Sequence, residues 1–265
     1  MPNLTDLPLG ISLALIELLA ITLAVGFLIL TRGYIQRHFN TSDETDDTVQ
    51  FYAGAIAAFY GIALAFITVA NWENYTRAVS IVSAEAASVG ALYRDVNGYP
   101  EPLSSELKAD LKEYLEFVVN EAWPAQKQGL ILQGSVQILN KFQDTLLQFE
   151  PTTEGQKVIH GEAFSQYNEF ITFRRQRLDI VNQMLPTILW VIILGGAVIT
   201  IFVTYFFFVP NIRLHVMLIV CYATLIAVVI YFTAVMENPL KGPVGISPSS
   251  YQVILDTLIN APSGK

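Results

Sequence analysis

Four long apolar stretches divide this chain of 265 residues. They run from Leu7 to Thr31, from Phe51 to Ala70, from Met184 to Val209 and from Leu214 to Met236. A helix needs about 20 apolar residues to cross roughly 30 Å of hydrocarbon, and each stretch is long enough. The pattern therefore predicts an all-α polytopic membrane protein with four transmembrane helices.

The links between these stretches differ greatly in length. Only Pro210–Arg213 separates the third stretch from the fourth, which predicts an antiparallel helical hairpin. The second and third stretches are separated by a long polar segment. We therefore expect residues 1–71 to hold the first two transmembrane helices, residues 72–183 an extramembrane helical domain, residues 184–236 the last two transmembrane helices, and residues 237–265 a C-terminal tail.

The polar segment keeps a helical period. After the second stretch, apolar residues recur in alternating steps of three and four, at Trp72, Tyr75, Val79, Val82, Ala86, Val89 and Tyr93. Similar steps lead from Phe164 through Leu185 into the third stretch, and two shorter helices are expected between them, ending near Trp123 and Pro151. The segment is therefore predicted to be an antiparallel bundle formed partly by extensions of the second and third transmembrane helices. Burial in the bundle core is sufficient to explain these apolar faces.

Composition excludes several classes of protein. Charged residues make up 14% of the chain, against about 25% in soluble domains, and the net charge of -8 disfavours nucleic acid as a partner. Cys221 is the only cysteine, and the three histidines are far apart in sequence. The chain has no metal-ligand spacing, no phosphate-binding glycine loop and no nucleophile motif. We therefore expect neither an enzyme nor a cofactor or metal site.

Charges beside the apolar stretches leave two orientations open. Short loops rich in Lys and Arg stay cytoplasmic. Arg32, Arg37 and Arg213 lie in short loops, which favours a helical domain outside the cell. The three arginines within Arg174–Arg177, just before the third stretch, favour the opposite orientation.

Three charged residues border the apolar faces of the polar segment. Arg174 occupies a position where an apolar residue is expected, and Glu85 and Arg94 flank the face that follows the second stretch. A buried arginine needs a carboxylate partner. These residues are the candidates for a structural ion pair, with Arg174 and Glu85 as the expected partners. The alternative is that all three are solvated.

Several short motifs, in order along the chain, carry a resemblance to a known family. The motifs are Tyr60–Tyr75, Val82–Ala86, Leu92–Arg94, Arg175–Leu178, Leu189–Trp190, Glu237–Gly242 and Ser247–Pro248. Within them, the main motif residues are Trp72, Tyr75, Pro239 and Gly242. The chain resembles the bestrophin-like domain family of bacterial membrane proteins. The family motif near the last span is closer to Asp-Arg-Pro-Phe-x-Gly, so this chain lacks its arginine and its phenylalanine.

The resemblance implies remote kinship with bestrophins, which are oligomeric ion channels with the pore on the symmetry axis. It implies a homo-oligomer of four or more subunits in the bacterial cytoplasmic membrane, with lipid and ions as partners. The second transmembrane helix would line the pore, Phe59 and Phe66 would form a constriction, and Asn71, Glu73 and Arg77 would lie at the mouth. Anion and cation selectivity both stay open. The rival hypothesis is a non-conducting scaffold or sensor whose helical domain binds a partner.

Overall fold

The computed structural model describes residues 7–39, 43–207 and 209–260. These residues form helices and connecting segments, without a β-strand among them, which confirms the predicted all-α class. The chain divides into two compact units. Unit 1 comprises residues 1–75, 184–237 and 242–244, and unit 2 comprises residues 76–183, 238–241 and 245–265.

Unit 1 contains the apolar helices. They are α1 (Leu9–His38), the first part of α2 (Asp43–Asp95), α7 (Thr187–Val203), which continues as the 3-10 turn Thr204–Phe206, and α8 (Ile212–Met236). All four are long and apolar enough to cross a membrane, as predicted. A third or less of each apolar window is buried within the chain. Most of their surface therefore faces lipid, a pore or another protein copy.

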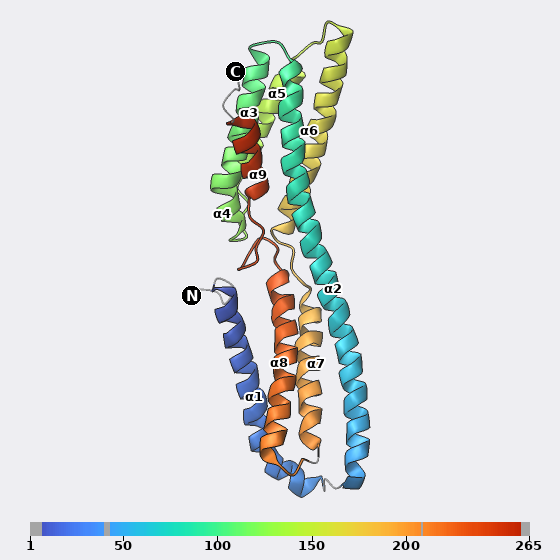
Figure 1. The fold of residues 1–265 in the computed structure, drawn as a ribbon. Helices are drawn as coiled ribbons and strands as arrows, with labels where there is room; N and C mark the ends of the chain where they lie inside the picture. Colours follow the sequence, from blue (N-terminus) through green and yellow to red (C-terminus); the bar gives the residue numbers. More distant parts are fainter. Residues whose placement is uncertain (1–6, 40–42, 208, 261–265) are drawn as a thin grey trace. The chain divides into compact units, whose positions relative to one another are not determined.

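Helices α1 and α8 pack together in Figure 1. Their shared core contains Leu28, Ile219 and Tyr205, and the Tyr205 hydroxyl donates a hydrogen bond to the Ala24 carbonyl (2.8 Å). The predicted tight turn before α8 is present. Its Asn211 side chain caps α8 by accepting a hydrogen bond from the Arg213 backbone N–H at 2.9 Å.

Unit 2 is a helical bundle. Its elements are the second part of α2, the 3-10 turn Val96–Gly98, α3 (Leu103–Phe117), the π-helical turn Val118–Ala122, α4 (Trp123–Gln126), α5 (Gly134–Leu147), α6 (Glu154–Ile180), α9 (Ser249–Ile254) and the π-helical turn Leu255–Ile259. In Figure 1, α3, α5, α6 and the second part of α2 run alongside one another. Their apolar stripes meet in a core that includes Val89, Leu111, Phe142 and Phe170, all fully buried.

The second and third transmembrane helices differ in how they connect to the polar segment between them. Helix α2 is continuous from Asp43 to Asp95, as the unbroken apolar pattern predicts. The predicted continuity of the last polar helix with the third span is wrong, because α6 ends at Ile180 and α7 begins at Thr187. Pro186 explains the break, since its ring disfavours helical geometry at Leu185 and it lacks a backbone N–H.

The segment after α8 is folded. Its described residues 238–241 and 245–260 belong to unit 2. The Ile246 N–H donates to the Pro239 carbonyl at 2.8 Å, and the Trp123 indole N–H donates to the Ile246 carbonyl at 3.2 Å. Gly242, in the motif that follows α8, has φ of +75°, a backbone conformation that suits glycine.

Candidate functional site

The membrane-spanning part of α2 has three distinct faces. One face packs on the remainder of unit 1. It includes Ala53 and Leu64, which are buried, and Tyr60, whose hydroxyl donates to the Ile193 carbonyl at 3.0 Å. A Cβ added at Gly196 of α7 would lie only 2.4 Å from the Tyr60 ring. Gly196 therefore permits close packing of α7 on α2 within one chain.

A second face of α2 carries large exposed side chains. Phe59 and Phe66 are 76% and 72% exposed, and Ile62 and Val69 are also exposed between and beyond them. Glu73 is exposed and continues the same face, seven residues after Phe66. Seven residues make about two turns of an α-helix, so residues 59, 66 and 73 lie one above another.

A third face of α2 carries small exposed residues. Gly54, Ala58, Gly61 and Ala65 recur in steps of four, three and four. At about 3.6 residues per turn, this face is rotated by roughly 110° from the aromatic face. A Cβ added at Gly54 or Gly61 would have no neighbour within 4 Å in the described part of the chain. Small residues of this kind permit close approach of a second helix in lipid.

Two of the three residues predicted for the pore mouth lie one turn apart on α2, and the third lies on another face. Arg77 is exposed, one turn beyond Glu73. Asn71 is 5% exposed, and its amide donates to the Thr233 carbonyl of α8 at 2.6 Å. Asn71 therefore lies on the packed face of α2, because its position is about 200° around the helix from Glu73. Its expected place beside Glu73 and Arg77 is wrong.

The aromatic residues of the first family motif are packing residues. The Trp72 ring stacks on Phe232 of α8, with centroids 6.2 Å apart. The Tyr75 hydroxyl donates to the Val244 carbonyl at 2.7 Å. Both contacts join α2 to α8 or to the segment after α8, within unit 1.

Unit 2 contains a fully buried arginine and glutamate pair. Arg177 of α6 donates through Nε to Oε2 of Glu85 at 2.6 Å and through Nη2 to Oε1 at 3.0 Å. Gln126 accepts from Arg177 Nη1 at 2.6 Å, and the Tyr114 hydroxyl donates to Glu85 Oε1 at 2.5 Å. The guanidinium carbon lies 5.9 Å from the ring centroids of both Trp123 and Tyr251. We call these six residues the Arg177 cluster.

Electrostatics in the Arg177 cluster favour the charged pair. Burial alone would lower the pKa of Arg177, but the carboxylate of Glu85 holds that pKa well above its usual range. Burial and the neighbouring Glu85 together raise the pKa of the Tyr114 hydroxyl, which therefore stays protonated and donates to the carboxylate. Bidentate arginine and carboxylate pairs with further hydrogen bonds offset the cost of burying two charges.

The predicted partner of Glu85 was wrong. Arg174 is half-buried and donates to the Ser135 hydroxyl at 2.8 Å, whereas Arg177, one turn later, reaches Glu85. Arg94 is exposed, and within the described ranges no carboxylate lies within 4 Å of it. Sequence reasoning missed Arg177, Tyr114, Gln126 and Tyr251. The family motif Arg175–Leu178 contains Arg177, but nothing in the local pattern distinguishes it from Arg174.

The described part of the chain contains no candidate metal-binding site. There, no three His, Cys, Asp or Glu side chains are close enough together to hold an ion. The exposed aromatic face of α2 is the candidate functional surface because it combines large exposed apolar side chains with Glu73 at its end.

Comparisons with known proteins agree with this architecture. A crystal structure described as that of a membrane protein superposes with a TM-score of 0.66 at 11% identity, covering 92% of this chain and 97% of that one. At that identity the likeness shows the fold alone. No curated protein matches the sequence. The family model of the bestrophin-like domain matches residues 18–251, and the chain belongs to that family of membrane proteins.

Proposed function

We propose that the protein is a homo-oligomeric ion channel of the bacterial cytoplasmic membrane, with α2 lining a pore on the symmetry axis. The observation that carries the proposal is the vertical alignment of Phe59, Phe66 and Glu73 on an exposed face of α2. Membership of a channel-type family supports it. The four apolar helices make the protein an integral membrane protein.

The three faces of α2 suit this arrangement. One face packs on its own chain through Tyr60 and Asn71. The small-residue face, with Gly54 and Gly61, allows the α2 helix of a neighbouring copy to approach. The aromatic face then points at the axis, where Phe59 and Phe66 form an apolar constriction that gates by excluding water.

Charged residues follow the constriction along α2. Glu73 and Arg77 are exposed where the apolar stretch ends. Rings of charged side chains at a pore mouth concentrate ions of opposite sign and set selectivity. Helix α2 continues without a break to Asp95, which gives the proposed gate a direct covalent link to unit 2.

Purified full-length protein in planar lipid bilayers tests this proposal. We expect discrete single-channel currents, and a larger open probability for Phe66→Ala, because the apolar constriction is widened. The matched control is Leu30→Ala, an exposed position on α1, which should behave as wild type. Absence of current across salts and pH values would contradict the proposal and favour the non-conducting scaffold.

Glu73→Gln tests the proposed pore mouth separately from the constriction. Loss of one negative charge per subunit is expected to shift the reversal potential in a salt gradient, without changing the subunit number measured by native mass spectrometry. An unchanged reversal potential in a conducting channel would remove Glu73 from the pore mouth.

A further inference from the structure

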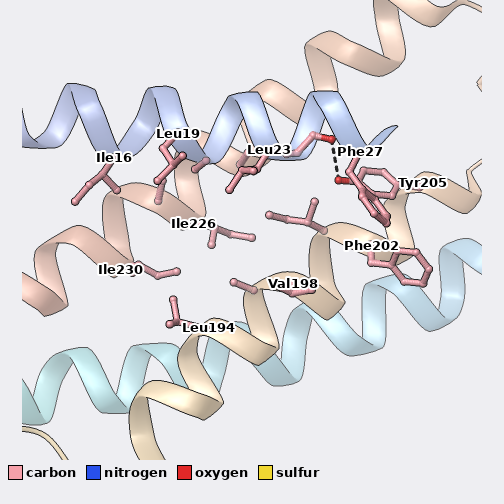
Figure 2. Close-up of a pocket in the computed structure, with 16 residues that line it drawn as sticks. Ile16, Leu19, Leu23, Phe27, Leu194, Val198, Phe202, Tyr205, Ile226 and Ile230 are labelled. Carbon is pink, nitrogen blue, oxygen red and sulfur yellow. Dashed lines mark hydrogen bonds between the residues drawn. The ribbon is translucent and has the colours of Figure 1, made fainter. Parts of the chain in front are cut away.

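Unit 1 contains a half-open apolar cavity between α1, α7 and α8. Its volume is about 470 Å³, and lining side chains such as Leu23 and Val198 are exposed in the single chain. Figure 2 shows side chains of the three helices pointing toward a shared space, and six of them mark its extent: Ile16, Leu23, Leu194, Val198, Ile226 and Ile230. All sixteen lining residues are apolar or aromatic, and the hydroxyl of Tyr205 is bonded to the Ala24 carbonyl.

Water is a poor occupant for this cavity. A buried water needs two to four polar partners, and apolar cavities without them stay dry. For comparison, a cavity of about 150 Å³ is enough to hold benzene. This cavity is about three times as large, so an apolar molecule has room to fill it.

The cavity lies within the membrane-spanning parts of all three helices. On α1 it extends from Ile16 to Phe27, which is roughly 16 Å of helix. That length is about half of the ~30 Å hydrocarbon core, which is the depth covered by the acyl chains of one leaflet. A whole transmembrane helix is about 10 Å wide with its side chains and does not fit inside this volume, so a helix of another protein copy would cover the cavity only from its open side.

We propose that this cavity binds one acyl chain of a bilayer phospholipid. The three helices hold the chain on separate sides, whereas lipid on a flat helical face is held on one side only. The bound lipid therefore stays with the protein when the surrounding bilayer is replaced by mild detergent. The proposal depends on the four transmembrane helices and is independent of ion conduction.

Two alanines on α1 provide a matched pair of variants. Ala20 lines the cavity, whereas Ala14 is exposed and lies outside it. Ala20→Phe places a ring in the cavity, and Ala14→Phe places the same ring on the outer surface of the same helix. Full-length protein is purified in mild detergent, and bound phospholipid is counted by native mass spectrometry and phosphate analysis.

We expect wild type and Ala14→Phe to retain at least one phospholipid per chain, and Ala20→Phe to lose most of it. Equal lipid content in all three proteins would overturn the proposal. Because Ala20→Phe is able to disturb folding, wild-type protein is also reconstituted with a phospholipid that carries a diazirine on its acyl chain. It is extracted into mild detergent and only then irradiated, so that retained lipid alone is cross-linked, and the labels should map to the lining residues.

Two results would contradict the proposed acyl-chain site. Labels spread evenly over the exposed positions of α1, such as Leu18 and Leu30, would indicate ordinary surrounding lipid. Cross-links between two copies of the chain at the lining residues, formed with a photoreactive side chain placed at Leu23, would show that a second subunit fills the cavity. A protein that retains lipid but never conducts would remove the channel proposal and leave the lipid site in place.

Discussion

Arg177 is almost completely buried in unit 2, and its carboxylate partner comes from a helix far away in sequence. The side chains of Arg177 and Glu85 are 2% and 0% exposed. A buried pair contributes little net stability relative to apolar residues, but removal of one member leaves the other charge buried alone. The Arg177 cluster is therefore sensitive to single substitutions.

Arg177→Met is expected to destabilise unit 2 by about 3–5 kcal/mol, because the Glu85 carboxylate loses its counter-charge in a buried site. Thermal unfolding of the full chain in detergent, followed by tryptophan fluorescence, measures the loss. Arg174→Met is the matched control and should cost only about 1 kcal/mol, since Arg174 donates to the neutral Ser135 hydroxyl. Equal losses for the two variants would exclude a special role for Arg177.

The stability of unit 2 is expected to depend on pH through His160. Its ring accepts from or donates to the Tyr99 hydroxyl at 2.7 Å and packs edge-on against Phe149 and Phe164. Burial lowers the pKa of His160 below its usual value of 6.5. Neutral imidazole is therefore favoured in the folded state, so the contribution to stability is complete above pH 6.5 and is lost as the pH falls through the folded-state pKa.

The melting temperature of wild type is therefore expected to fall more steeply between pH 7.5 and 5 than that of His160→Phe, which keeps an aromatic ring and cannot be protonated. His38→Gln, at an exposed position of α1, retains His160 and should follow wild type. Parallel curves for wild type and His160→Phe would show that His160 does not contribute to the pH dependence.

At the scale of single helices, the sequence pattern predicted which segments are helical better than which side of each helix is buried. The expected apolar face of α6 included Tyr167, which is buried, and Arg174 and Leu178, which are only half-buried. Phe170, Arg177 and Ile180 complete the buried face, so this face is rotated from the expected one and the two overlap at Tyr167. A buried arginine does not add to the pattern of apolar residues. Periodicity therefore predicted Arg174 as the buried arginine, where the structure has Arg177.

The break between α6 and α7 depends on a partner distant in sequence. The Leu185 N–H donates to Glu237 Oε1 at 3.1 Å, and the Trp190 indole N–H donates to the same oxygen at 3.1 Å. A carboxylate at the end of α8 thus satisfies a backbone group that Pro186 leaves outside a helix. The sequence around residue 185 could not predict this contact, because Glu237 lies 52 positions later.

Glu237→Ala is expected to destabilise the protein by about 1–3 kcal/mol, because two partly buried donors lose their acceptor. Glu237→Gln retains an acceptor oxygen and should lose less. Thermal unfolding in detergent compares the two variants with wild type. Equal stability of Glu237→Ala and wild type would show that water replaces the carboxylate.

At the scale of the whole molecule, hydrophobicity correctly predicted the four transmembrane helices, because crossing hydrocarbon imposes a minimum apolar length. It did not predict that the segment after Met236 contributes to unit 2. Tyr251 and Ile246 reach that core through contacts with Trp123, which lies more than 120 positions earlier. Such long-range pairing leaves no periodic signal in a short segment.

The exposed small-residue face of α2 leads to a prediction about assembly. Gly61 has open space around its Cα in the single chain, whereas helices in a close-packed assembly approach to about 8–10 Å. In a Cys221→Ser background, Gly61→Cys is therefore expected to give covalent dimers with a short bifunctional thiol reagent. Leu30→Cys, which is 80% exposed on α1, is the control and should give few.

The same preparation is expected to contain four or more subunits by native mass spectrometry, because the proposed channel is an oligomer with its pore on the symmetry axis. Cross-linking at Gly61 in a complex of two subunits would place the small-residue face at an interface without an axial pore, and would favour the scaffold. Equal cross-linking at positions 61 and 30 would instead indicate random collision in the membrane. Only the combination of selective cross-linking and a larger assembly supports α2 as the pore-lining helix, with Phe59 and Phe66 directed at the axis.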